Sequence, residues 1–154
     1  MTFTVDIARL DALTAGELHD VFRLRIEVFV VEQACPYPEL DGKDPQALHL
    51  RLLDEGRLAA YARIFAAGET APEARIGRVV VAPGFRGRRL GERVMREAIA
   101  ACGKLSPSAD IAISAQAHLQ RFYGSLGFSV TSAEYLEDGI PHVDMVRAAE
   151  SIAS

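Results

Sequence analysis

Apolar and polar residues alternate along short stretches of the chain, with the period of two that is typical of half-buried strands. In the first stretch, Phe3, Val5 and Ile7 share one face. The run Val79-Val80-Val81 differs, because an uninterrupted series of β-branched residues indicates a strand covered on both faces. The predicted strands are residues 3–8, a hairpin over 47–66, a central strand over 76–82, a short strand over 110–115, and a hairpin of 128–136 with 141–147 around Asp138-Gly139.

Other stretches repeat their apolar residues every three or four positions, which is the spacing of a helix with one buried face. Thr14 and Glu17 form the pair of a capping box at the start of the first helix. Gly103 follows the second helix and is expected to stop it. The predicted helices cover residues 14–31, 87–102 and 116–126, and a proline-rich loop covers residues 34–46.

The order of these elements is strand, helix, loop, two strands, strand, helix, strand, helix, two strands. Residues 76–82, 87–102 and 110–115 form a β-α-β unit, whose two strands run parallel, whereas the hairpins are antiparallel. We therefore expect an α/β fold with a mixed sheet flanked by helices. Because no linker interrupts the pattern, residues 1–154 are predicted to form a single domain.

Composition is consistent with one folded domain and narrows its partners. Of the 154 residues, 49% are apolar, and no apolar run reaches the roughly 20 residues that cross a bilayer. The net charge of −4 argues against a nucleic-acid partner. Because no signal peptide is visible, we expect a cytoplasmic protein in which Cys35 and Cys102 are reduced thiols. The two cysteines match no metal-ligand spacing, so no metal site is expected.

Basic residues concentrate in one segment of this acidic chain. Residues 75–96 hold seven arginines and one glutamate, a net charge of +6, so the other residues sum to −10. Within this segment a strand passes directly into a helix, whose first N–H groups have no partner inside the helix. Such a helix start, with glycines for close approach and arginines for charge, predicts a phosphate or pyrophosphate site, with ordinary helix capping as the alternative. The residues concerned are Arg86, Gly87, Arg88, Arg89 and Gly91.

The sequence Arg86-Gly87-Arg88-Arg89-Leu90-Gly91 resembles the Gln/Arg-x-x-Gly-x-Gly/Ala motif of the GNAT superfamily of N-acetyltransferases. The strand before it, and the later pattern of Gln116, Tyr123 and Gly127-Phe128, resemble the same superfamily. Three further segments are similar to its ElaA-like branch: residues 25–33, 115–120 and 137–142. The resemblance covers residues from about 20 to 147, and it implies a GNAT-like domain.

The resemblance also implies acetyl-CoA as the cofactor and an amine of a small molecule or peptide as the acceptor. The strand over 76–82 would splay from the strand over 110–115 so that the pantetheine arm can pair with it. The pyrophosphate would meet the N–H groups that follow. Arg89 stands where most of the superfamily has glycine, and a helical φ is expected there. The implied cofactor-binding residues are Val79, Val80, Val81, Arg86, Gly87, Arg88, Arg89, Leu90, Gly91, Gln116 and Tyr123.

The resemblance assigns Tyr123 as the general acid of a direct transfer in a ternary complex. A phenol with a pKa of about 10 is protonated at neutral pH and can donate to a departing thiolate. A core position on the apolar face of its helix is the alternative. The N–H of Val81 would polarise the carbonyl. The candidates for the general base and for acceptor binding are Glu32 first, His118 second and His142 third. A direct water path to solvent, with no dedicated base, is the alternative.

The acceptor pocket is expected between the first helix, the loop over 35–45 and the last hairpin. Two other functions stay open: a sensor that binds CoA or another phosphorylated ligand without turnover, and an acyltransferase that uses longer acyl-CoA. No membrane partner is expected, and the chain is taken as a monomer or homodimer. The acidic residues near the pocket, which would favour a cationic amine, are Glu32, Glu39, Asp41, Asp44, Glu137 and Asp138.

Overall fold

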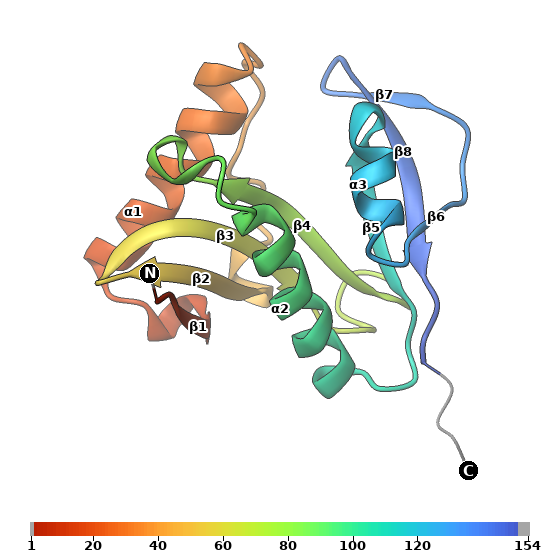
Figure 1. Cartoon of the computed structure of the whole chain (residues 1–154), viewed down its shortest axis with the longest axis horizontal. Coiled ribbons are helices and arrows are strands. Elements are labelled where there is room, and N and C mark those ends of the chain that lie inside the picture. The colour runs from red at the N-terminus through yellow and green to blue at the C-terminus, as the bar shows by residue number, and fades with distance from the viewer. Residues whose placement is uncertain (1, 151–154) are drawn as a thin grey trace.

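The computed structural model describes residues 2–150 and has one mixed sheet with helices on its faces (Figure 1). The sheet order is β1-β2-β3-β4-β5-β8-β6, with β7 paired to β8. The strands are β1 (Thr4–Arg9), β2 (Leu48–Asp54), β3 (Arg57–Phe65), β4 (Ala74–Val81), β5 (Ile111–Gln116), β6 (Ser129–Val130), β7 (Tyr135–Glu137) and β8 (Ile140–Arg147). The helices are α1 (Ala15–Ile26), α2 (Leu90–Leu105) and α3 (Gln120–Gly124), with the π-helical η2 (Glu27–Glu32) and the 3₁₀ turns η1 (Leu10–Ala12), η3 (Asp44–Gln46), η4 (Pro83–Phe85) and η5 (Ala117–Leu119).

Helices α1 and α2 cover opposite faces of the sheet, as the alternation of side chains along β3 requires. Ala60 and Ala62 point to one face and pack in the large core together with Val94 of α2. Tyr61, between them, points to the other face and packs with Val21 of α1. The predicted α/β fold with a mixed sheet is therefore confirmed.

Strands β4 and β5 separate over most of their length, which confirms the expected splay. They pair in parallel only where Ala74 faces Ile111 and Arg75 faces Ala112, and Figure 1 shows the two strands diverging beyond that point. The run of valines in β4 is consequently less covered than predicted: Val80 is buried, whereas its two neighbours are half-buried. The open side of β4 leaves backbone groups available to a ligand.

A bulge distorts β4 just before this open stretch. Tyr61 of β3 lies opposite Val80, but Arg63 lies opposite Gly77, so β4 contains one extra residue. The extra residue is accommodated where Arg78 adopts a left-handed φ of 52°. Bulges turn a strand and redirect its side chains, and this one directs Arg78 toward the loop that precedes β2.

Several element boundaries differ from the prediction. The second helix begins at Leu90 rather than at residue 87, because the preceding turn contains left-handed residues at Gly87 and Arg89. It continues past Gly103, which was wrongly expected to stop it, to Leu105. Residues 116–126 are not one helix, since β5 extends to Gln116 and the 3₁₀ turn η5 precedes α3. The segment 128–136 forms only the short β6 and the start of β7.

The first helix changes type near its end. Beyond Ile26 it continues as the π-helical η2, with hydrogen bonds from Gln33 N to Val28 O (3.1 Å) and from Cys35 N to Val30 O (2.9 Å). These bonds span five residues, and such wide turns occur frequently at functional sites.

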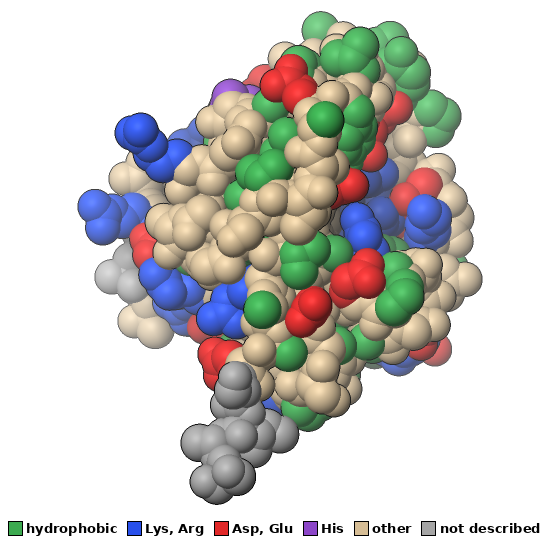
Figure 2. All heavy atoms as spheres, turned by 90° about the vertical axis from the view of Figure 1, so that its right-hand side faces the viewer, with side chains coloured by type: hydrophobic (Ala, Val, Ile, Leu, Met, Phe, Trp, Pro, Cys, Tyr) green, Lys and Arg blue, Asp and Glu red, His purple; other side chains and the backbone are tan. Residues whose placement is uncertain are grey.

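Within residues 2–150, no helix is long and apolar enough to cross a membrane. Figure 2 shows the side of the molecule formed by β5 to β8, where hydrophobic side chains gather at the upper end and charged side chains of both signs are dispersed below. Leu136 of β7 is 73% exposed. The hairpin of β7 and β8 therefore presents apolar surface to solvent.

Candidate active site

The start of α2 is exposed and rich in positive charge. Arg86 forms an ion pair of 2.8 Å with Glu32, and Arg88 lies over the ring of Phe85 at 5.4 Å. Arg89 is exposed and forms no ion pair with any residue of the described part of the chain. The first N–H groups of α2 have no helical acceptor, so the loop combines backbone donors with exposed arginines. This arrangement suits a polyanion.

The expectation that Arg89 has a helical φ is wrong. Its φ is 57° and its ψ is 31°, which is left-handed. The chain must turn from η4 into α2 within a few residues, and the turn uses left-handed conformations at both Gly87 and Arg89. A residue with a Cβ pays roughly 1–2 kcal/mol for this conformation, which explains why glycine suits the position.

Replacing Arg89 with glycine is expected to keep or raise the melting temperature. Relief of the left-handed strain, about 1–2 kcal/mol, exceeds the entropic cost of glycine, about 0.5–1 kcal/mol. Arg89→Ala removes the same charge but keeps the strain, so thermal melting of the two variants separates strain from charge. A lower melting temperature for Arg89→Gly than for Arg89→Ala would contradict this account.

The open side of β4 presents a backbone donor. Ala82 N donates to Ala59 O at 2.8 Å, so these two residues form a hydrogen-bonded pair. Because such pairs alternate along antiparallel strands, the neighbouring pair of Ala60 and Val81 is not hydrogen-bonded. The N–H of Val81 therefore points away from β3, toward the side that β5 leaves open.

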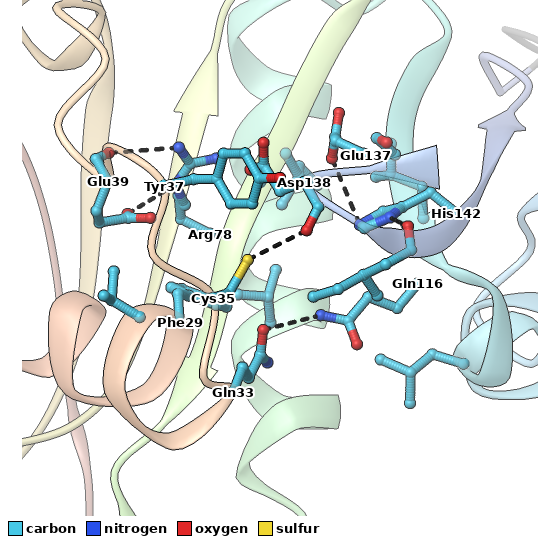
Figure 3. A pocket seen from close by; sticks show the side chains of 18 of the residues that line it. Phe29, Gln33, Cys35, Tyr37, Glu39, Arg78, Gln116, Glu137, Asp138 and His142 are labelled. Atoms are coloured by element: carbon cyan, nitrogen blue, oxygen red, sulfur yellow. Dashed lines mark hydrogen bonds and ion pairs between the residues drawn. The ribbon is translucent and has the colours of Figure 1, made fainter. Parts of the chain in front are cut away.

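A cavity of about 150 Å³ lies where β4 and β5 separate. Its walls come from η2, the loop after it, the bulge of β4, the end of β5, η5, α3 and the β7–β8 hairpin (Figure 3). Two contacts hold the loop across the cavity: Cys35 Sγ donates to Asp138 O at 3.3 Å, and Gln116 Nε2 lies 3.5 Å from Gln33 Oε1. The pocket predicted between the first helix, the loop and the last hairpin is thus present.

Tyr123 lines this cavity from α3. It is 9% exposed, and its ring makes edge contacts with Phe122 and Phe128 at centroid distances of 5.0 and 6.3 Å. Burial raises the pKa of Tyr123 to about 12. The phenol therefore stays protonated throughout the physiological range, as a general acid requires. Gln116 lines the same cavity from the end of β5.

The three candidate bases lie in different environments. Glu32 is not among the residues that line the cavity, and its carboxylate faces Arg86 at 2.8 Å. His118 is exposed on η5 and also lies outside the cavity wall. His142, ranked last from the sequence, lines the cavity and is 8% exposed. The pairing of β5 with β8 places His142 opposite Gln116, a juxtaposition that sequence order does not reveal.

A buried ion-pair network fixes the loop over 34–46. Arg25 of α1 is fully buried, and its guanidinium contacts Glu39 Oε2 and Asp44 Oδ1, each at 2.8 Å. It also lies over the rings of Phe22 and Tyr61, at 5.3 and 5.8 Å. The carboxylate partners of Arg25 lie 14 and 19 residues further along the chain, and only the fold brings them to it.

The network continues to β3 and to the bulge of β4. Arg63 makes two hydrogen bonds to Asp41, at 2.9 and 2.8 Å, and one to Asp44 at 3.2 Å. Arg78 donates from Nε to Glu39 at 2.7 Å. Burial alone would raise the pKa of Asp44, but its hydrogen bonds and charge interactions with Arg25 and Arg63 outweigh burial and hold that pKa below the usual range.

Four of the six acids expected to attract an amine are therefore neutralised by arginines. They are Glu32, Glu39, Asp41 and Asp44. The remaining two, Glu137 and Asp138, both line the cavity from the last hairpin and form no ion pair with an arginine or lysine in residues 2–150. Of these six acids, the two without an arginine partner therefore lie on this hairpin and not in the loop.

A sheet splayed between two parallel strands, an arginine- and glycine-rich helix start and a cavity beside the splay are features that this chain shares with the acyltransferases of the GNAT fold. The model of the acetyltransferase (GNAT) domain matches residues 17–149, and the chain belongs to this family. Protein ElaA of Escherichia coli K12 is 39% identical over 137 residues, which are 88% of this chain and 90% of ElaA.

Two solved structures support the same assignment. An acyl-CoA N-acyltransferase from Pseudomonas aeruginosa is 41% identical, with a TM-score of 0.91 over 96% of this chain and all of its own. The crystal structure of E. coli ElaA is 36% identical, with a TM-score of 0.88 over 95% of this chain and 99% of its own. The chain is thus an acyltransferase of the GNAT fold.

Proposed function

We propose that this protein is an acetyl-CoA-dependent N-acetyltransferase that transfers the acetyl group directly to an amine in a ternary complex. The observation that carries the proposal is the position of Tyr123. This buried, protonated phenol lines a cavity that opens onto the unpaired stretch of β4. An acid at this place can protonate a thiolate leaving from a thioester that lies along β4.

The residues present fit a CoA molecule. The side of β4 away from β3 has free backbone groups beyond Arg75, and the start of α2 offers unpaired N–H groups. A Cβ built on Gly91 would lie 3.8 Å from Phe122 and 4.0 Å from Val81, so the protein itself leaves room there. Arg88 and Arg89 extend from an exposed loop toward solvent and can meet phosphates.

Acetyl-CoA, when bound, supplies an acetyl group activated as a thioester. The N–H of Val81 donates to the carbonyl oxygen and stabilises the negative charge that develops there. Tyr123 gives its proton to the departing sulfur. The cavity walls hold the amine beside these two groups, so that its nitrogen attacks without an enzyme-bound acyl stage.

Thermal melting with acetyl-CoA tests the proposal. At a concentration of about 100 times Kd, a ligand of the folded state adds about 2.7 kcal/mol, a rise of roughly 5–10 °C for a chain of this length. Release of thiol when amines are added distinguishes a transferase from a non-catalytic sensor. A parallel series, in which acetyl-CoA is replaced by longer acyl-CoAs, measures which acyl chain the protein uses. Absence of any shift with acetyl-CoA overturns the proposal.

Gly91→Ala is expected to weaken acetyl-CoA binding about tenfold or more while the fold is kept. The added methyl group makes only ordinary contacts inside the protein, at 3.8 Å and beyond, but occupies the space where the helix start would meet a pyrophosphate. Gly103→Ala, in the same helix with nothing within 4 Å, is the matched control and should bind normally. Titration calorimetry of both variants measures the effect, and equal affinities would contradict it.

A further inference from the structure

The charges around the cavity indicate which amines it accepts. Resting on the proposed N-acetyltransferase activity, we propose that the acceptor is a primary amine that enters as a cation and has no carboxylate beside its nitrogen, and that His142 Nε2 removes its proton. The proposal thus separates simple amines and amine side chains from free α-amino acids. It depends on the contacts of one arginine, two carboxylates and one imidazole.

Arg78, the arginine that lines the cavity in the described part of the chain, is already occupied. Its Nε donates to Glu39 Oε2 at 2.7 Å, and its Nη2 donates to Glu39 O at 3.4 Å and lies 3.6 Å from Asp41 Oδ2. Glu39 is held in place in turn by Arg25 and is only 7% exposed at its side chain. Figure 3 shows Arg78 directed at Glu39.

A free α-amino acid needs a partner for its carboxylate, normally an arginine that offers two N–H groups. Because Nε and Nη2 of Arg78 already face Glu39 and Asp41, Arg78 has only Nη1 left for a second carboxylate and cannot offer it the two-nitrogen fork while those contacts are kept. The same carboxylate would also approach Glu137 and Asp138, which line the cavity and have no arginine or lysine partner in residues 2–150. Glu137 and Asp138 are exposed, so solvent weakens their repulsion of a third carboxylate, but the sign of their charge still disfavours an amino acid and favours a lone ammonium group.

His142 is oriented to receive the proton of that ammonium. Its Nδ1 lies 2.7 Å from Ile140 O. Since a carbonyl oxygen only accepts, Nδ1 carries a hydrogen, and in the neutral ring Nε2 is then the atom with the free lone pair. Nε2 lies 3.4 Å from Glu137 Oε2, and the ring stacks on Tyr135 at 6.2 Å. The carboxylate of Glu137 stabilises the imidazolium that forms when the proton arrives.

The proton and bond balance closes with the groups present. His142 Nε2 takes one proton from the ammonium, and the freed nitrogen bonds to the thioester carbonyl carbon. The bond from carbon to sulfur breaks, and the sulfur takes the proton of Tyr123. The nitrogen loses a second proton as the amide forms, which restores the phenol of Tyr123. The products are the N-acyl amine, the free thiol and one proton on His142, which passes to solvent.

Matched pairs of acceptors test the proposal on the unmodified protein. Pentylamine is compared with norleucine and phenethylamine with phenylalanine, because each pair differs only by the α-carboxylate. With saturating acetyl-CoA, thiol release should give a kcat/KM at least about tenfold higher for the amine of each pair. An equal or higher kcat/KM for the amino acids overturns the proposal. The proposal is also overturned if the protein binds acetyl-CoA but neither amine accelerates thiol release. Failure of acetyl-CoA to shift the melting temperature counts instead against the proposed function.

Two substitutions isolate the groups involved. His142→Gln should lower kcat/KM for the amines at least about tenfold while the acetyl-CoA melting shift is kept, whereas Glu134→Gln, an exposed acid just before β7, should change neither. Glu39→Gln releases Arg78 and should narrow the preference for amines over amino acids severalfold. An unchanged rate in His142→Gln removes the role given to the imidazole, and an unchanged preference in a folded Glu39→Gln removes the role given to Arg78.

Discussion

Replacing Tyr123 with phenylalanine is expected to lower kcat by about 10²- to 10⁴-fold, the usual contribution of a general acid. The KM for acetyl-CoA should change little, because the lost hydroxyl acts on the departing sulfur. Steady-state thiol release measures both constants. Since burial raises the pKa of Tyr123 to about 12, deprotonation of this phenol should cause no loss of rate between pH 7 and pH 10.

The same raised pKa sets the sign of the effect on stability. The folded protein favours the neutral phenol, so this contribution is complete below the unfolded pKa of about 10 and is lost as the pH rises toward 12.

Tyr61→Phe is the matched control for Tyr123→Phe: it removes a buried hydroxyl 2.6 Å from His49 Nδ1, away from the cavity. That variant should lose about 1–3 kcal/mol of stability yet keep its kcat. A Tyr123→Phe enzyme with unchanged kcat would return Tyr123 to a purely structural role.

Replacing Arg25 with alanine is expected to lower the free energy of unfolding by about 3–5 kcal/mol, because Asp44 and Glu39 then lose a fully buried partner. For a chain of this length, this corresponds to a fall in melting temperature of roughly 6–20 °C. Arg96→Ala, which removes an exposed ion pair with Glu92, should cost less than about 0.5 kcal/mol. Urea unfolding of both variants provides the comparison.

The buried network of Arg25, Glu39 and Asp44 also predicts how the free energy of unfolding depends on pH. The pKa of Asp44 is lowered in the folded protein, so its contribution is present above the unfolded value, near 4, and is lost as the pH falls through the folded value. Arg25→Ala should weaken this acid dependence. If Arg25→Ala destabilises no more than Arg96→Ala, the buried network does not hold the loop in place.

The sequence alone determined most of the elements and led to the prediction of an anion site, because both depend on local patterns. Alternation and helical spacing identify the strands and helices. The passage from a strand into an arginine- and glycine-rich helix start is likewise visible in one short segment of the sequence. The prediction that Tyr123 is a general acid came only from the family resemblance, because its position on an apolar helix face is equally typical of a core residue. The conformation of Arg89 was missed, because a turn between two elements follows from their relative placement and not from the residue itself.

The tertiary structure decided which charges at the cavity are paired and which are not. Arg25, Arg63 and Arg78 come from α1, β3 and β4, and their partners come from one loop, so no sequence spacing could pair them. That pairing neutralises the loop acids and leaves Glu137 and Asp138 at the cavity. His142 entered the site because β8 pairs with β5 across the sheet, a long-range contact that the order of residues does not specify. Most residues of the proposed cofactor site are therefore close together in the sequence. The residues of the proposed acceptor site come together only when distant segments pack against one another.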